Sequence, residues 1–299
     1  MQLDILLFLQ SIRTNSIQII AEIFSLFEEI AIPLVIIMIL LWCVSRKKAF
    51  AAVTALLSAL IVSQSLKAIF KVERPFQRYP HLIEGKRLST ATGYSFPSGH
   101  STTSGAFYSS LIVTIWKKWA TVICLIPIVL VPLSRLVLGV HWPFDVAIGT
   151  IIGLASGFIL TPLMLRLYDE RRPFLVFTFI FGLLTSIAGA VIAILLSITE
   201  IDKIAFEDLM STLAITGGAM LGFYLERKFV SSAPENGSMG MKITRFVLGL
   251  VSTALVAMII HIIPAPAEFT SFTTYFGLGI WCICLYPLLA VRLHLMEKE

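Results

Sequence analysis

Long apolar runs separated by short polar stretches make up most of this chain. Many of the runs approach or exceed the roughly 20 residues that a helix needs to cross a bilayer. We predict nine membrane-spanning helices, at about residues 26–45, 49–70, 101–116, 119–138, 144–166, 173–197, 209–229, 243–264 and 272–293. The first 25 residues mix polar side chains with leucine and isoleucine, which predicts an amphipathic helix on the membrane surface. The expected fold class is therefore all-α, a polytopic membrane helical bundle.

The composition excludes an ordinary soluble domain. Hydrophobic residues make up 57% of the 299 residues and charged residues only 14%, whereas soluble domains average about 25% charged residues. The start, MQLDILLFLQSIRTN, has no basic segment before its apolar residues and no small-residue cleavage site, so we expect no cleaved signal peptide. The four cysteines lie inside apolar runs, which is typical of buried thiols and not of a disulfide framework or metal site.

Positive charges alternate along the predicted loops. Fourteen of the 23 lysines and arginines fall in every second connection, at residues 45–48, 117–118, 166–172, 227–245 and 292–299. The positive-inside rule places these loops in the cytoplasm, and therefore the N-terminus outside and the C-terminus inside. The net charge of +5 then reflects membrane topology, and we expect no nucleic-acid partner. We expect an integral protein of a bacterial inner or plasma membrane.

Three polar motifs fall on the other side of the membrane in this topology. They are KAIFKVERP at 67–75, SFPSGHSTTS at 95–104 and SRLVLGVHWPFD at 134–145. Each lies at the outer end of a predicted span, so the three should meet at one face. Loops carry functional residues more often than the elements that they connect. The sequence therefore predicts one site, which faces the periplasm or exterior.

Cations and backbone amides in these motifs suit a phosphoryl group. Lys67, Arg74 and Arg135 lie near the membrane face, where charges are costly unless an anion meets them. Ser98 and Gly99 precede a predicted helix, whose first N–H groups and dipole favour an anion. Simpler explanations stay open, namely interfacial anchoring by each cation and helix capping by Ser98. Four further cations fit such anchoring: Lys71, Arg78, Lys86 and Arg87.

Two histidines and a carboxylate supply chemistry that could act on that phosphate. His141 and Asp145 are four residues apart, so on a helix they would share a face. Asp145 could then fix the tautomer of His141 and leave Nε2 free to attack phosphorus. His100, at a helix start, suits the general acid that protonates the leaving group. A purely structural His–Asp pair is the alternative. Three adjacent cations disfavour a zinc site, and we expect neither metal nor cofactor.

The three motifs resemble the signature of the type-2 phosphatidic acid phosphatase superfamily. That signature reads Lys, six residues, Arg-Pro; then Pro-Ser-Gly-His; then Ser-Arg, five residues, His, three residues, Asp. This chain matches it in order and spacing with KAIFKVERP, PSGH and SRLVLGVHWPFD. The resemblance implies a six-span helical core and a metal-independent phosphohistidine mechanism. It assigns His141 as nucleophile, His100 as acid and Asp145 as orienting carboxylate. Phosphate would be held by Lys67, Arg74, Ser98, Gly99 and Arg135.

We therefore predict an integral-membrane lipid phosphate phosphatase. Candidate substrates are phosphatidic acid, phosphatidylglycerophosphate, undecaprenyl diphosphate and a sphingoid phosphate. A lipid phosphotransferase would use the same phosphohistidine with an acceptor other than water, and the sequence does not separate the two. A transporter with a vestigial site is the alternative from another class. Intact His100, His141 and Asp145 argue against that alternative, and no paired broken helices typical of a carrier are evident.

The resemblance ends near residue 200, which suggests a modular chain. We expect an amphipathic surface-helix region at 1–25, a six-span phosphatase core at 26–198 and a three-span C-terminal membrane extension at 199–299. Two spans carry small-xxx-small patterns, which are typical of helix-packing faces and could also serve a homodimer. They contain Gly149, Gly153 and Gly157 in one span, and Gly218 and Gly222 in the other.

Overall fold

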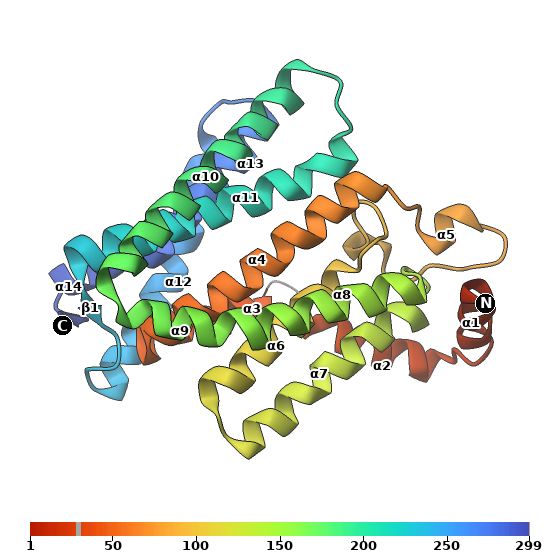
Figure 1. Ribbon diagram of the computed structural model, residues 1–299, viewed down its shortest axis with the longest axis horizontal. Helices are drawn as coiled ribbons and strands as arrows, with labels where there is room; N and C mark the ends of the chain where they lie inside the picture. Colours follow the sequence, from red (N-terminus) through yellow and green to blue (C-terminus); the bar gives the residue numbers. More distant parts are fainter. Residues whose placement is uncertain (28–30, 299) are drawn as a thin grey trace. The chain divides into compact units, whose positions relative to one another are not determined.

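The computed structural model describes residues 1–27 and 31–298, and these residues are mostly helical (Figure 1). The first helices are α1 (Gln2–Ser11), α2 (Asn15–Leu26), α3 (Ala31–Ile39), α4 (Arg46–Phe70), α5 (Pro75–Arg78), α6 (Gly99–Ile115), α7 (Lys118–Val137), α8 (Pro143–Ala155) and α9 (Thr161–Asp169). The later helices are α10 (Arg171–Ile198), α11 (Lys203–Leu225), α12 (Met239–Ile262), α13 (Ala267–Ile280) and α14 (Tyr286–Arg292).

Short irregular turns and one small strand pair complete the described secondary structure. Four π-helical turns follow α3, α8, α11 and α13 directly: η1 (Leu40–Val44), η3 (Ser156–Leu160), η4 (Glu226–Val230) and η5 (Trp281–Leu285). A single 3-10 turn, η2 (Leu88–Thr90), lies in the loop before α6. The two-residue strands β1 (Ser232–Ala233) and β2 (Glu297–Lys298) pair antiparallel.

The expected all-α membrane bundle is confirmed. Within the described residues, seven helical stretches are long and apolar enough to cross a membrane. They are Arg46–Arg78, Lys118–Val137, Pro143–Asp169, Arg171–Ile198, Lys203–Val230, Met239–Ile262 and Ala267–Arg292.

Two of the nine predicted spans are not among these seven stretches. The span predicted at 26–45 includes residues 28–30, which lie outside the described residues, and its remainder contains the shorter apolar helix Ile32–Val44. The span predicted at 101–116 is α6, which has only 17 residues. Serine and threonine side chains lower the hydropathy of α6, and most of its side chains are buried.

Contacts between residues divide the chain into two units. The first unit holds Met1–Leu34 and Ala52–Pro162, and the second holds Val35–Ala51 and the chain from Leu163 onward. The sequence predicted segment boundaries after residues 25 and 198. The two units have other boundaries, and the three predicted segments stay a prediction.

In the first unit, α6 packs against both α7 and α8. A Cβ atom on Gly153 of α8 would lie 2.4 Å from the carbonyl oxygen of Thr102 and 2.9 Å from the Cα of Gly105. On Gly157 it would lie 1.7 Å from the Oγ of Ser109. Only glycine fits such a close approach of two helices. The glycine pattern of this span therefore packs against α6 of the same chain.

The N-terminal segment forms two helices, α1 and α2, which lie against the motif loops of the first unit (Figure 1). Leu6 of α1 is buried together with Ile83 and Trp142. Arg13 follows α1 and forms an ion pair with Glu84 at 2.9 Å. These contacts tie the first 26 residues to the loops that carry the predicted site.

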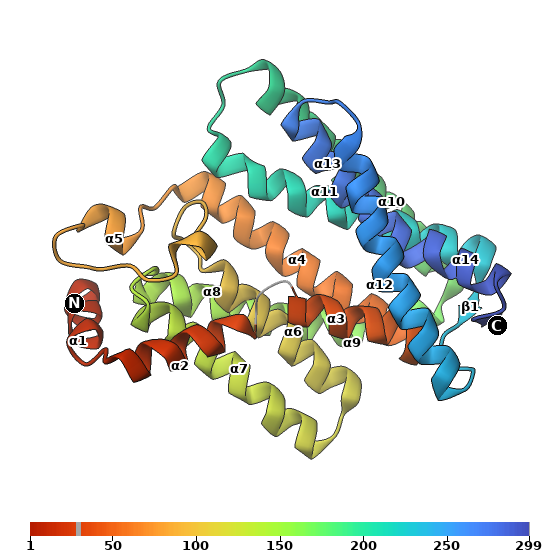
Figure 2. The same ribbon diagram turned by 180° about the vertical axis from the view of Figure 1, so that it is seen from behind.

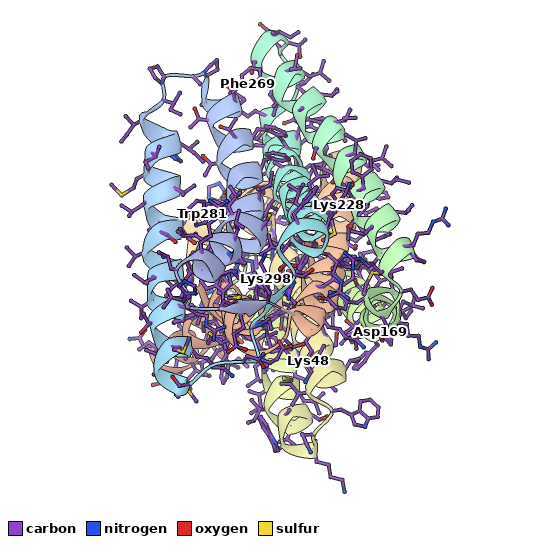
Figure 3. The ribbon with its side chains drawn as sticks, turned by 90° about the vertical axis from the view of Figure 1, so that its left-hand side faces the viewer. Lys48, Asp169, Lys228, Phe269, Trp281 and Lys298 are labelled. Atoms are coloured by element: carbon purple, nitrogen blue, oxygen red, sulfur yellow. The ribbon has the colours of Figure 1, made fainter. Side chains whose placement is uncertain are left out.

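In the second unit, α11 packs against α10 and α13, and α12 packs against α13 (Figure 2). A Cβ on Gly218 would lie 2.0 Å from the carbonyl oxygen of Phe276 in α13. The second glycine pattern therefore also packs inside the chain, and neither pattern leaves a glycine surface for a second copy. A buried ion pair between Arg46 and Glu226 joins the start of α4 to η4. Figure 3 shows the side chains as sticks, with Lys48, Asp169, Lys228 and Lys298 of this unit among the labelled residues.

Candidate active site

The ends of four helices in the first unit carry most of the predicted site residues. Lys67 lies in the last turn of α4, and Arg135 lies in the last turn of α7. His100 lies in the first turn of α6, and Asp145 lies in the first turn of α8. Arg74 precedes α5 as its N-cap. The spans therefore position the site through their ends, as the alternation of apolar runs and motifs predicts.

Most of these charged or polar side chains are buried. Lys67 is 6% exposed, Arg74 is 1% exposed and Arg135 is fully buried, while His141 and Asp145 are 1% and 2% exposed. Charge removed from water must be met by hydrogen bonds or by opposite charge. Five such groups in one unit therefore form a buried cluster of polar and charged side chains.

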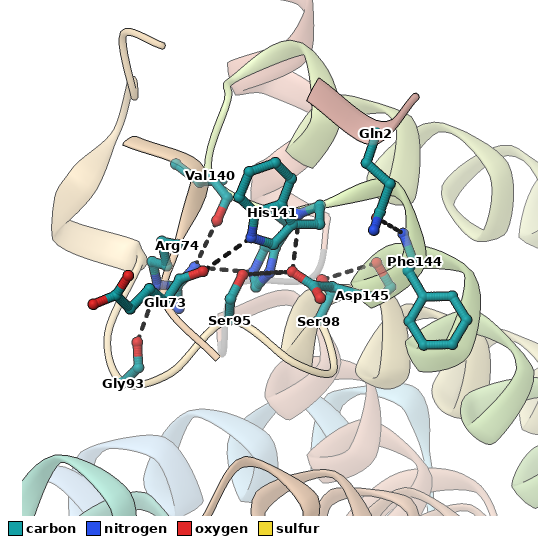
Figure 4. Close-up of polar contacts among 12 residues, drawn as sticks. Gln2, Glu73, Arg74, Gly93, Ser95, Ser98, Val140, His141, Phe144 and Asp145 are labelled. Atoms are coloured by element: carbon teal, nitrogen blue, oxygen red, sulfur yellow. Dashed lines mark hydrogen bonds and ion pairs between the residues drawn. The ribbon is translucent and has the colours of Figure 1, made fainter. Parts of the chain in front are cut away.

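The ring of His141 is held from both of its nitrogens (Figure 4). Nε2 lies 3.1 Å from Nη1 of Arg74. A guanidinium group can only donate, so Nε2 accepts and the ring proton is on Nδ1. Nδ1 lies 3.5 Å from Oδ2 of Asp145 and 3.4 Å from Oγ of Ser95. The structure therefore brings His141 and Asp145 together, although His141 lies before the start of α8 and the two do not share a helix face.

Ser95 is a site residue that the motif spacing did not single out. Its side chain is fully buried, and its hydroxyl donates to Oδ2 of Asp145. The same carboxylate oxygen accepts the backbone N–H of Trp142 at 2.9 Å. The backbone carbonyl of Asp145 accepts from the N–H of Ser98 at 3.0 Å. Asp145 thus joins the second motif to the third, and the signal for Ser95 was its place at the start of SFPSGH.

Arg74 is oriented in part by backbone carbonyls. Its Nε donates to the carbonyl of Gly93 at 3.1 Å, and Nη1 donates to the carbonyl of Val140 at 3.0 Å. Nη2 donates to the carbonyl of Thr92. These contacts hold the guanidinium group next to the ring of His141.

The other predicted phosphate-binding residues surround the start of α6 and the end of α7. Ser98 is the N-cap of α6 and accepts the hydroxyl of Ser101 at 2.9 Å, so the capping explanation holds for its side chain. A Cβ on Gly99 would lie 3.7 Å from Nζ of Lys67, which places the lysine at this helix start. Arg135 donates to the hydroxyl of Ser25 at 2.8 Å.

Positive charge dominates the electrostatics of the site. Arg135, Lys67, Arg74 and Arg87 all lie close enough to act on the charge of His100. Arg87 is half-buried and donates to the carbonyl of Glu22 at 3.1 Å, so the anchoring role expected for it does not describe its surroundings. Sequence spacing could not reveal this fourth cation, because Arg87 belongs to none of the three motifs.

His141 lies in the connection between α7 and α8. Burial lowers the pKa of its imidazole well below the usual value, and the positive charges of Arg74, Arg135 and Lys67 lower it further. The neutral ring, with Nε2 able to share its lone pair, is therefore the form present at neutral pH. The same cations place His141 within electrostatic reach of His100.

A cavity of about 640 Å³ opens beside Asp145 in the same unit. Phe70, Phe96 and Phe144 form a row of aromatic rings along it: Phe70 and Phe96 meet edge to face at 5.3 Å, and Phe96 stacks on Phe144 at 5.6 Å. The remaining lining comes from Gln2, Leu3, Val72, Arg78, Tyr79 and Trp142. The cavity is thus mainly apolar and has one carboxylate and one cation on its wall.

Among residues 1–27 and 31–298, no group of three or more histidine, cysteine, aspartate or glutamate side chains is arranged to hold a metal ion. Lys67, Arg74 and Arg135 act electrostatically on both His141 and His100.

The site combines a histidine that a carboxylate orients with clustered cations at the ends of apolar helices. These features define a class of integral membrane protein with a site suited to phosphoryl groups. Residues 48–169 match the PAP2 superfamily, and residues 210–298 match the transmembrane extension of PAP2 superfamily phosphatases. Together the two matches cover more than half of the chain. The chain belongs to the type-2 phosphatidic acid phosphatase superfamily.

Curated relatives in this superfamily act on different lipids, according to their names. The chain is 32% identical over 134 residues to an undecaprenyl-diphosphatase of Sulfolobus acidocaldarius, covering 44% of this chain and 62% of the relative. It is 40% identical over 86 residues to the decaprenylphosphoryl-5-phosphoribose phosphatase of Mycobacterium tuberculosis, covering 28% and 45%. It is 33% identical over 85 residues to phosphatidylglycerophosphatase B of Escherichia coli, covering 27% and 34%. The chain thus spans less than two thirds of each relative. No solved structure matches it.

Proposed function

We propose that this protein is a lipid phosphate phosphatase that works through a phosphohistidine on His141. The observation that carries the proposal is the placement of Arg74 on Nε2 of His141 at 3.1 Å while Asp145 and Ser95 face Nδ1. A phosphoryl group that binds Arg74 and replaces its N–H at Nε2 would lie next to the lone pair of that nitrogen. The names of the superfamily relatives support the same class of reaction.

The proposed reaction has two displacements at phosphorus. In the first, Nε2 of His141 forms an N–P bond as the bond from phosphorus to the leaving oxygen breaks. His100 gives that oxygen its proton, and the negative charge of the bound phosphate would stabilise protonated His100 against the surrounding cations. The leaving group is a lipid alcohol for a monoester and a lipid monophosphate for a diphosphate. In the second, His100 accepts a proton from water, the water oxygen attacks phosphorus, the N–P bond breaks and inorganic phosphate leaves.

Charge stabilisation in this proposal comes from the side chains and helix amides. Lys67, Arg74 and Arg135 would bind the equatorial oxygens of the phosphoryl group, where negative charge spreads in the transition state. The first amides of α6, at Gly99, add the positive end of a helix dipole. These groups provide the charge neutralisation that many phosphatases obtain from metal ions, which supports a metal-independent reaction.

The aromatic cavity supports a lipid as substrate. Its row of Phe70, Phe96 and Phe144 offers an apolar surface that an isoprenoid or acyl chain would cover. Asp145 belongs to both the cavity wall and the pair with His141, so a lipid lying there would have its phosphate near the ring. Undecaprenyl diphosphate and phosphatidylglycerophosphate, taken from the names of two relatives, are the first substrates to try. On the predicted topology, the site would act on the leaflet away from the cytoplasm.

A phosphate-release panel over lipid monophosphates and diphosphates, run in EDTA, tests the proposal. We expect release from at least one of them, with EDTA causing no loss, and a fall of several orders of magnitude in the His141→Ala variant. His261→Ala is the matched control, because His261 is an exposed histidine in the last turn of α12. Activity that persists in His141→Ala would refute the phosphohistidine. Activity that EDTA removes would refute metal independence alone.

A further inference from the structure

A second cavity lies in the C-terminal unit, far along the sequence from the three motifs. Its volume is about 450 Å³. The wall from α10 consists of Arg171, Arg172, Leu175, Val176 and Phe179, and the wall from α11 and η4 consists of Tyr224 and Lys228. Three cations and four apolar or aromatic side chains therefore share one hollow.

No carboxylate neutralises these cations within the described part of the chain. Arg171, Arg172 and Lys228 are exposed, and none forms an ion pair among the described residues. The neighbouring acidic residue Asp169 is bound by Lys47 at 2.6 Å. Glu226 is likewise bound by Arg46, and Glu170 precedes α10 as its N-cap. The cavity thus keeps an excess of positive charge.

Lys228 is nevertheless held in one place. Its Nζ donates to the hydroxyl of Tyr224 at 2.8 Å and lies 5.1 Å from the centre of the same ring. The Tyr224 ring in turn lies 5.2 Å from the ring of Phe179 across the cavity. Hydroxyl and aromatic partners orient an ammonium group without neutralising it. A freely moving surface anchor would not need this support.

The polar and apolar walls are arranged in order along the helix axis. Arg171 and Arg172 begin α10, and Leu175, Val176 and Phe179 follow within about 12 Å at a rise of about 1.5 Å per residue. Val176 is 51% exposed and Phe179 is 43% exposed on a helix apolar enough to cross a membrane. The cations therefore lie at the membrane surface and the apolar wall lies beneath it, which is the order of headgroup and acyl chain in a phospholipid.

From this order and the excess positive charge, we propose that the cavity binds an anionic phospholipid of the surrounding leaflet. The headgroup phosphate is bound by Arg171, Arg172 and Lys228, and the first acyl carbons lie along Val176 and Phe179. On the topology predicted from the loops this is the cytoplasmic surface, where anionic lipids attract clustered lysine and arginine. The site does not depend on the reaction proposed for His141.

Native mass spectrometry of the protein taken from nanodiscs tests this site. The discs contain equal amounts of phosphatidylglycerol and phosphatidylcholine with identical acyl chains. We expect the wild type to retain phosphatidylglycerol at least about tenfold over phosphatidylcholine, and Arg172→Gln/Lys228→Gln to lose about tenfold of that retention. Lys117→Gln/Lys118→Gln is the matched control, because it removes two charges at the start of α7 and should retain the lipid.

The comparison of the two double variants separates this cavity from the catalytic site, which could also hold an anionic lipid. Equal retention of phosphatidylglycerol by Arg172→Gln/Lys228→Gln and the control would overturn the proposal, as would equal retention of the two lipids by wild type. Displacement of the lipid by glycerol phosphate at comparable concentration would also overturn it, because the apolar wall would then contribute nothing. Reduced retention in Phe179→Ser, with an unchanged unfolding temperature, would support the acyl-chain placement.

Discussion

Different side chains contact the two ring nitrogens of His141. Arg74 faces Nε2, while Asp145 and Ser95 face Nδ1. A ring held from both sides cannot rotate, and a proton held on Nδ1 keeps the lone pair on Nε2. Two experimental predictions follow from these contacts at the level of single residues.

The lowered pKa of His141 predicts a reaction that survives mild acid. The neutral ring is the nucleophile, and its pKa is depressed first by burial and then by Arg74 and Arg135. Activity should therefore persist as the pH falls through the ordinary histidine value of about 6.5 and decline only below it. The measurement is kcat/KM against pH. The pKa of the substrate phosphate, about 6, is determined in a separate titration. An acid limb at or above the ordinary value would contradict the assignment.

Ser95→Ala should lower kcat by about ten- to a hundredfold and leave KM nearly unchanged. A hydrogen bond to a charged group contributes about 1.5–3 kcal/mol, and Ser95 gives one to Asp145 without reaching the substrate. Ser95→Thr, which keeps the hydroxyl, should recover part of the loss. Ser104→Ala is the control, since Ser104 is a buried serine of α6 that donates to the carbonyl of Pro127. Equal effects of Ser95→Ala and Ser104→Ala would show a merely structural role.

The three motifs contain His141 and Asp145, which the structure brings together. A shared helix face does not explain this contact, because α8 begins at Pro143, after His141. Ser95 and Arg87 were missed because their partners lie elsewhere in the chain: Ser95 meets Asp145 fifty positions away. Ser98 caps α6 with its oxygen as acceptor, and its role in holding phosphate stays a prediction.

At the scale of helices, glycine determines how closely α6 and α8 approach. The carbonyl of Thr102 and the backbone of Gly105 occupy the space that a side chain at Gly153 would need. Since α6 carries His100 and α8 carries Asp145, this contact also sets the spacing of the two site-bearing helix starts. The hydrophobic pattern predicted both helices, including the short span at 101–116 that forms α6. Most side chains of α6 are buried, and a buried helix needs no lipid-length apolar surface.

Gly153→Ala should therefore lower the unfolding temperature in detergent. The added methyl group meets backbone atoms that cannot move aside, and overpacking of this kind costs about 1–3 kcal/mol. Gly240→Ala provides the control, because the nearest atom to its added Cβ is Ser238 Oγ at 3.9 Å. A Gly153→Ala protein as stable as Gly240→Ala would show that the helices can separate without penalty.

At the scale of the whole molecule, the distribution of charge predicts how the chain is threaded through the membrane. The α12 helix has 24 residues, about 36 Å, which is enough to cross a hydrocarbon core of about 30 Å. Basic residues precede it and continue into its start, whereas the PAPAEF stretch at 264–269 follows it. Its start should thus be cytoplasmic and its end exterior.

Single cysteines placed at the two ends of α12 test this threading. Asn236→Cys and Ala265→Cys are each made in a variant that lacks Cys43, Cys124, Cys282 and Cys284, and both positions are exposed. A membrane-impermeant maleimide should label Ala265→Cys in intact cells and Asn236→Cys only after lysis. The opposite pattern would reverse the orientation and place the site in the cytoplasm. Labelling of both in intact cells would mean that α12 does not span the membrane.

The class of protein, most of its spans and the chemistry of its motifs could be read from the order of residues, because hydrophobic runs and spacings of four to seven residues are local properties. The hydrogen bonds that support the site residues could not be predicted in this way. Arg74 rests on carbonyls of Gly93 and Val140, and Arg135 rests on Ser25, more than a hundred residues earlier in the chain. Such contacts exist only once helices far apart in sequence have packed, since packing alone brings their ends within hydrogen-bonding distance.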